Sequence, residues 1–102
     1  MDEIRRLWRE HQNAPYPDGY RGVEVAGVEL VMLDADIAGC VSTYLGNGGR
    51  LDLQRTAILG QCYRDVSLVV RELTGSARDY FGHLERMAGS VLEALSGVTP
   101  AV

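Results

Sequence analysis

The residues of this chain best suited to metal binding or nucleophilic chemistry are two histidines and two cysteines, His11, Cys40, Cys62 and His83. Structural zinc sites take such ligands in closely spaced pairs, and here the four stand singly, far apart in the sequence. Cys62 falls in an apolar helical stripe, where a free cysteine behaves as a small hydrophobic residue. Cys40 is expected too deep in a helix for the N-terminus to activate its thiolate. The pattern predicts no metal site, no cofactor, no catalytic cysteine and, in a reducing compartment, no disulfide.

Carboxylates form two further patterns that chemistry could use. Asp34 and Asp36 are close enough to share a proton or hold Mg²⁺, but acids in a first turn also cap helices and suit the helix dipole. Asp79 precedes His83 by four residues, the spacing of neighbours on one helix face. That pair is half of a catalytic arrangement, and no serine is placed to complete it. We expect Asp34 to cap a helix, Asp79 and His83 to form a surface pair, and no catalytic residue.

An aromatic group is the most suggestive binding feature, and its members are Trp8, Tyr16, Tyr20, Arg21 and His11. Tyrosine, tryptophan and arginine dominate binding hot spots, and binding residues are common on irregular loops such as 13–21. The rings could line a pocket between this loop and the start of the second helix, with Asp34 or Asp36 as its polar group. They could instead fix the loop on the core, which is the interpretation we favour because aromatic rings bury well.

Hydrophobic spacing predicts the elements that would position these side chains. Helical periodicity covers residues 2–12, 35–45, 53–74 and 76 to about 97, and β-branched residues predict a hairpin over 22–33. The fold class is α+β, predominantly helical, with the order α-β-β-α-α-α: four helices and one short antiparallel β-hairpin. The link Thr74-Gly75-Ser76 is so short that the third and fourth helices should form an antiparallel helical hairpin.

Helix ends and faces follow from local signals. Asp52 is expected to cap the third helix, and Ser76-x-x-Asp79 resembles a capping box for the fourth, with Asp in place of the usual Glu. The apolar stripe predicted for the third helix is Ile58, Cys62, Val66, Val69, Val70 and Leu73.

The register of the predicted hairpin poses a problem. A two-residue loop at Ala26-Gly27 places Glu24 directly opposite Glu29, and like charges so placed are unfavourable. Either a longer loop shifts the register or a cation lies nearby, and the sequence leaves both open. The open edges of a hairpin can also pair with a second chain, which is one reason to expect a dimer.

Four glycines, Gly39, Gly60, Gly82 and Gly89, lie inside predicted helices and away from the apolar stripes. Each costs roughly 1 kcal/mol relative to alanine. A glycine-rich composition explains them most simply. The alternative is that a second backbone approaches, in particular at Gly82 and Gly89 on the fourth helix.

Composition limits the partners. The 102 residues suit one domain, which we assign to 1–97, with 98–102 as a frayed C-terminal tail. The net charge of −4 and the lack of a basic run argue against a nucleic-acid partner. No apolar run has the length of a membrane span, and the N-terminus lacks an apolar signal core. We therefore expect a cytoplasmic protein with no membrane partner.

The leading functional hypothesis is a non-catalytic protein-interaction or binding module that acts as a homodimer, with a further protein partner as an option. The second is a small-ligand-binding protein or small enzyme with a pocket near Trp8, Tyr16 and Tyr20. The third is a helical transcriptional regulator. Missing active-site signatures favour a protein that is not an enzyme. The candidate ligand- or partner-binding residues are Trp8, Tyr16, Tyr20, Arg21, Asp34, Gly82 and Gly89.

Overall fold

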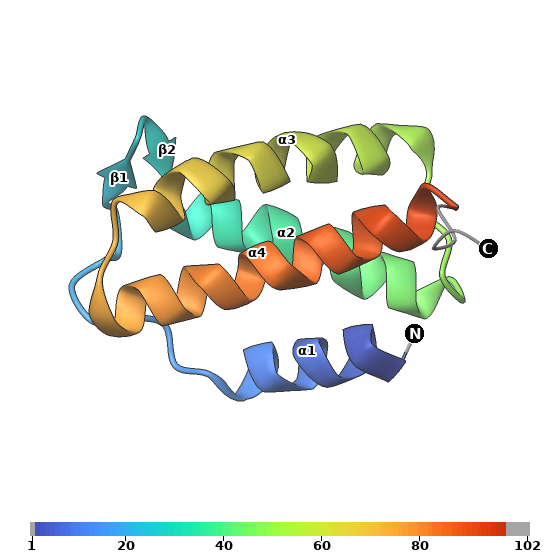
Figure 1. The fold of residues 1–102 in the computed structure, drawn as a ribbon, viewed down its shortest axis with the longest axis horizontal. Coiled ribbons are helices and arrows are strands. Elements are labelled where there is room, and N and C mark those ends of the chain that lie inside the picture. Colours follow the sequence, from blue (N-terminus) through green and yellow to red (C-terminus); the bar gives the residue numbers. More distant parts are fainter. Residues whose placement is uncertain (1, 98–102) are drawn as a thin grey trace.

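The computed structural model describes residues 2–97 as four helices and a two-stranded antiparallel hairpin (Figure 1). The helices are α1 (Asp2–Asn13), α2 (Leu30–Gly46), α3 (Leu53–Arg71) and α4 (Gly75–Leu95), and the strands are β1 (Glu24–Val25) and β2 (Val28–Glu29). The predicted α+β class, the element order and the antiparallel pairing of α3 with α4 are confirmed. The predicted tail, 98–102, lies outside the described residues. Within residues 2–97, no helix combines the length and apolarity needed to cross a membrane.

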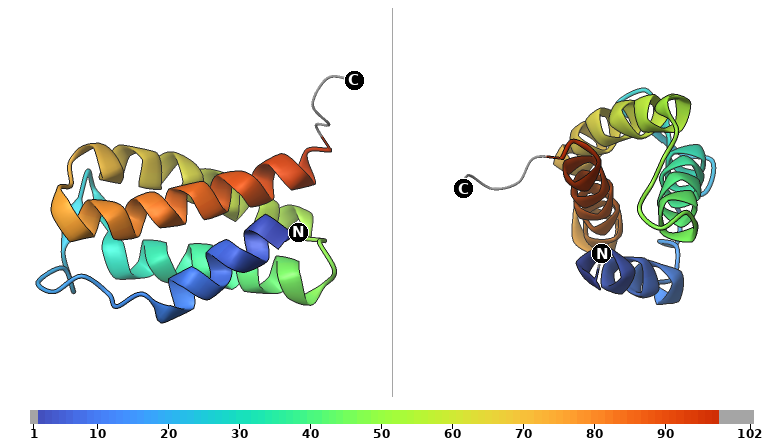
Figure 2. Two further views of the ribbon diagram at one scale, coloured as in Figure 1. Left: turned by 60° about the horizontal axis from the view of Figure 1, so that its bottom comes forward. Right: turned by 90° about the vertical axis from the view of Figure 1, so that its right-hand side faces the viewer.

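The helices pack lengthwise around one core, with α4 in contact with each of the other three (Figure 2). The buried face of α4 consists of Ala77, Phe81, Leu84, Met87, Ala88 and Val91. α1 lies along α4 and buries Ile4 and Leu7. Each fully buried large apolar side chain contributes about 1.5–3 kcal/mol, so this shared face holds the helices together.

α2 begins at Leu30, where the sequence predicts a strand up to residue 33 and a helix only from 35. Leu30, Leu33 and Ile37 are all buried, and their spacing fits one helix face better than alternation in a strand. The prediction that Asp34 caps this helix is therefore wrong. Asp34 lies in the second turn, where its carboxylate is free to make tertiary contacts.

The cap of α2 also resolves the conflict in the hairpin. Glu24 does lie opposite Glu29, in the register predicted for a two-residue loop at Ala26-Gly27. The Glu29 carboxylate turns to the start of α2 and accepts hydrogen bonds from the N–H groups of Val31 (2.9 Å) and Met32 (3.2 Å). The positive end of the helix thus stabilises this charge, and neither a longer loop nor a cation is needed. Glutamate is not a preferred N-cap, so the sequence carried no signal for it.

The buried stripe of α3 keeps Cys62, Val66 and Val69 of the predicted one, whereas Val70 is only half-buried and Leu73 lies beyond the helix end. Leu59 is fully buried, and Ile58, which was predicted to be buried, is 42% exposed. The helix ends at Arg71 and not at residue 74. The predicted cap is confirmed, because the Asp52 carboxylate accepts a hydrogen bond from the Arg55 N–H at 2.8 Å.

The junction between α3 and α4 lies earlier in the chain than predicted, at residues 72–74. Gly75 adopts a left-handed φ of +62° and opens α4, with Thr74 at the N-cap and no side-chain cap bond. Ser76 consequently lies inside the first turn, so the capping box predicted for Ser76 and Asp79 is wrong.

Candidate functional site

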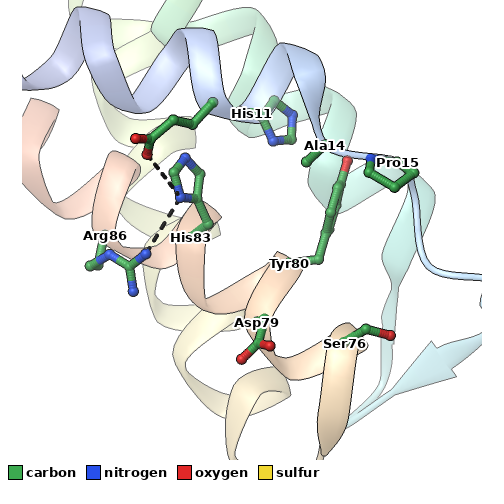
Figure 3. A pocket seen from close by; sticks show the side chains of 9 residues that line it. His11, Ala14, Pro15, Ser76, Asp79, Tyr80, His83 and Arg86 are labelled. Atoms are coloured by element: carbon green, nitrogen blue, oxygen red, sulfur yellow. Dashed lines mark hydrogen bonds and ion pairs between the residues drawn. The ribbon is translucent and has the colours of Figure 1, made fainter.

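A half-open hollow of about 410 Å³ lies between the C-terminal end of α1 and the first half of α4 (Figure 3). Ala14, Pro15 and Tyr80 supply its apolar surface. Its polar and ionisable groups are Glu10, His11, Ser76, Asp79, His83 and Arg86. A concave apolar surface with a few convergent polar groups is the usual form of a small-ligand site.

His83 connects α4 to α1 at this hollow. Its Nε2 lies 2.7 Å from the Leu7 carbonyl oxygen, and because a carbonyl only accepts, Nε2 carries the proton and donates. Its Nδ1 lies 3.4 Å from Nη2 of Arg86 and 3.9 Å from Oε1 of Glu10. The ring is therefore held in one orientation with its second nitrogen between a cation and an anion. The predicted surface pair of His83 with Asp79 is wrong, because His83 turns toward α1.

Asp34 joins α1, α2 and α4 through a hydrogen bond from Tyr80 and a close polar contact with His11. The Tyr80 hydroxyl donates to Oδ2 at 2.6 Å, and Nε2 of His11 lies 3.1 Å from Oδ1. Because a carboxylate only accepts, the His11 nitrogen that faces it, Nε2, is the one that carries a proton. The side chains of His11 and Asp34 are only 9% and 17% exposed, and hydrogen bonds in such surroundings are stronger than in water. Nδ1 of His11 is buried and has no hydrogen-bond partner among residues 2–97.

Tyr80 acts as a fixed donor at the edge of the hollow. Burial of the phenol, together with its hydrogen bond to Asp34, raises the pKa of Tyr80 well above its usual range. The ring centroid lies 5.3 Å from that of His11, 5.4 Å from that of Tyr16 and 5.2 Å from that of Phe81. Because the hydroxyl is committed to Asp34, Tyr80 offers the hollow its ring and not a free polar group.

The predicted aromatic group divides between two places. The Tyr16 hydroxyl donates to the Tyr20 carbonyl at 3.0 Å, and the guanidinium carbon of Arg21 lies 5.5 Å from the Tyr16 ring centroid. These contacts lie within the loop before β1, and Tyr16 and Tyr20 are also packed, partly buried, against the core. Trp8 lies half-buried on α1, with its ring centroid 6.0 Å from that of His11. The described lining of the hollow contains none of these four side chains.

The glycine-bearing face of α4 has a neighbour within the chain itself. A Cβ added at Gly89 would lie 3.0 Å from Cε1 of Tyr63 on α3, so the Tyr63 ring occupies the space in which a second backbone would have to lie. Gly82 has open space where a Cβ would stand. The two glycines therefore have different surroundings, although the sequence treats them as one feature.

Cys40 and Cys62 are buried free thiols on α2 and α3, and the burial of Cys62 agrees with its place in the predicted apolar stripe. Burial raises the pKa of both thiols, that of Cys62 to about 11, so both stay protonated at neutral pH and are poor nucleophiles. His11 and His83 stack with ring centroids 6.4 Å apart. Within residues 2–97, no three His, Cys, Asp or Glu side chains come together as a metal site.

Among the polar side chains of the hollow, Tyr80, Glu10 and Arg86 were not predicted from the sequence. Tyr80 had a usable signal, because a tyrosine next to the buried Phe81 marks the edge of an apolar stripe, where phenols are half-buried. Glu10 and Arg86 are exposed charged residues on helices, and no local pattern separates them from the others.

The chain matches no protein-family model, and no curated protein and no solved structure gave a significant match.

Proposed function

We propose that this protein binds a small molecule in the hollow between α1 and α4. The observation that supports this is the pair of oriented imidazoles: the Leu7 carbonyl fixes His83, and the Asp34 carboxylate fixes His11. Groups held in place before a ligand arrives lose little entropy on binding, which is how pre-organised sites gain affinity. The proposal is binding and not catalysis, because the Tyr80 hydroxyl is committed to Asp34 and the buried thiols stay protonated.

The test is to recover the ligand from protein purified without denaturation from its own host, by native mass spectrometry and extraction. Ala14 is an exposed residue of the rim, so Ala14→Trp should fill the hollow and abolish retention. Ala57 is equally exposed but lies on α3, so Ala57→Trp is the matched control and should retain the molecule. Equal retention by both variants would place the ligand elsewhere.

A homodimer is the second candidate function, and a different surface supports it. α2 carries only two charged residues, Asp34 and Asp36, and Asp34 is used internally. The outer side of the helix exposes Met32 (58%) and Gly39, and a groove beside Gly39 is bordered by Ile58 of α3. A helix with so few charges around its circumference is usually covered. A second copy of this chain is the partner we propose.

The two reasons that the sequence gives for a dimer carry less weight than this surface. Each strand of the hairpin has two residues, so its edge offers little backbone for pairing, and Tyr63 already covers Gly89.

Sedimentation velocity tests whether the outer face of α2 or the glycine-bearing face of α4 forms the dimer interface. Gly39→Arg should dissociate the dimer, whereas Gly82→Arg, which changes the same residue type inside α4, should leave it intact. A wild-type protein that sediments as a monomer would contradict this candidate.

A further inference from the structure

One ring nitrogen of His11, a side chain that lines the hollow, has no hydrogen-bond partner among the described residues and indicates the chemistry of the ligand. The His11 side chain is nine-tenths buried, and its Nε2–H is committed to Asp34. With Nε2 as the donor toward Asp34, Nδ1 is the acceptor of the corresponding imidazole tautomer, and it is buried and has no partner among the described residues. A buried acceptor without a donor is destabilising. The ring projects from α1 toward Tyr80 and His83, so a ligand that brings an N–H donor to this edge would satisfy it (Figure 3).

The charges around the hollow favour a cation. Glu10 of α1 and Asp79 of α4 are exposed carboxylates of the lining, and Asp34 lies directly behind His11. One oxygen of Glu10 is paired with Arg6 at 2.9 Å, and the other oxygen is the one that faces His83. The lining contributes one arginine, Arg86, against these carboxylates. Opposite charges attract most strongly where low-dielectric walls focus the field, as they do in a cleft.

The apolar part of the lining favours an organic ion over a bare metal ion. Ala14 and Pro15 offer no ligand atoms in their side chains, and the ring of Tyr80 can attract a cation by its face. We infer that the hollow takes a small organic ammonium ion. One N–H donates to Nδ1 of His11, the charge lies near Glu10 and Asp79, and the carbon skeleton rests on Tyr80. This inference rests on the proposed function.

Four probes with one ring and different head groups test this class: benzylamine, benzyltrimethylammonium, benzyl alcohol and benzoate. Each is titrated into uniformly ¹⁵N-labelled protein, and the amide shifts of residues around the hollow report binding. Benzylamine should bind most tightly, because it has both the charge and the N–H donors. Benzyltrimethylammonium should be weaker because it lacks an N–H for His11. Benzoate should be the weakest, because the carboxylates repel it.

Three variants tie the affinity to the named charges. Glu10→Gln should weaken benzylamine binding by about two- to fivefold, the usual range for a solvent-exposed ion pair. Arg86→Gln should strengthen benzylamine binding, because the repulsive cation is removed. Glu72→Gln at the end of α3 is the matched control, since it removes a carboxylate outside the hollow and should change the affinity little.

The outcomes separate this inference from the proposed function. Tightest binding by benzoate, or weaker benzylamine binding in Arg86→Gln, would overturn the cation class while leaving a ligand site in place. If no probe shifts the amides of the hollow but Ala14→Trp still abolishes retention of a native molecule, the ammonium class is again overturned and the function stands. If, in addition, Ala14→Trp retains the native molecule as well as the wild type does, both the ammonium class and the proposed function are contradicted.

Discussion

Tyr80 is the residue at which the core and the hollow meet. Its ring packs against Phe81 and Tyr16, and its hydroxyl is the hydrogen-bond donor that α4 supplies to the carboxylate of Asp34 on α2. A hydrogen bond to a buried charged group contributes more than one between neutral groups. The orientation of His11 depends on the same carboxylate, so Tyr80 influences the hollow without offering it a free polar atom.

Replacement of Tyr80 by phenylalanine keeps the ring and removes this donor. Tyr80→Phe should lower the free energy of unfolding by about 1.5–3 kcal/mol, the range for a hydrogen bond to a charged group, as measured by urea denaturation. Tyr63→Phe is the matched control, because the Tyr63 hydroxyl has no hydrogen-bond partner among residues 2–97 and its loss should have almost no effect. Equal effects of the two substitutions would mean that the hydrogen bond from Tyr80 to Asp34 does not stabilise the folded protein.

At the scale of the elements, helical glycines show how the same residue type acquires different surroundings. Gly82 and Gly89 stand two turns apart on α4, and the sequence groups them on one face. The antiparallel packing of α3 places the Tyr63 ring against Gly89 and leaves Gly82 open. This difference comes from the register between two helices, which local spacing does not contain.

Alanine substitutions at these two glycines test whether the Tyr63 ring restricts Gly89 and not Gly82. Gly82→Ala should raise the free energy of unfolding by about 1 kcal/mol, the full difference in helix propensity. Gly89→Ala should gain less, because the new methyl group forces the Tyr63 ring to move. In a Tyr63→Ala background, Gly89→Ala should recover the full gain. Equal gains for both glycines in the wild-type background would show that Tyr63 does not restrict Gly89.

The start of α2 marks the limit of sequence reasoning at this scale. Leu30, Leu33 and Ile37 satisfy helical spacing. The β-branched neighbours and the alternating residues of the hairpin nevertheless favour a strand over the same residues, so the sequence predicted a strand up to residue 33. The deciding contact is the Glu29 cap, and glutamate at this position has no statistical signature. Asp52, which belongs to a preferred capping type, was predicted correctly by the same kind of argument.

At the scale of the whole molecule, the helices and their order were predictable because helical periodicity is a local property. The hollow was not, because its defining bonds connect distant parts of the chain. His83 and Leu7 are 76 residues apart, and Tyr80 and Asp34 are 46 apart. A sequence shows which side chains can make such bonds, and only the packing of α1 and α2 on α4 shows which of them do.

Buried acidic groups with high pKa values predict how the stability of the whole fold depends on pH. The pKa of the Cys62 thiol is about 11 against an ordinary 9.0, chiefly because burial disfavours the thiolate. The folded state therefore binds this proton more tightly than the unfolded state does. The resulting stabilisation is complete below about pH 9 and is lost as the pH rises toward 11.

The measurement is the free energy of unfolding at about pH 8 and about pH 10, in wild type and in Cys62→Ala. Wild type should lose more stability over this interval than the variant, because the variant has no thiol to ionise. Cys40, Tyr16 and Tyr80 also have raised pKa values, so the variant should still lose some. Identical losses in the two proteins would show that Cys62 is not protected from ionisation in the fold.

The contact of α1 with α4 has a consequence for how the chain is made. α1 is synthesised before α4, so Ile4 and Leu7 have no apolar surface of α4 to cover them while translation continues. An isolated helix of 12 residues is only marginally stable in water, so α1 depends on α4 for its lasting structure, and the Arg6 pairs with Glu3 and Glu10 supply only local support. The hollow between α1 and α4 forms only when α4 leaves the ribosome and places Tyr80 and His83 beside α1.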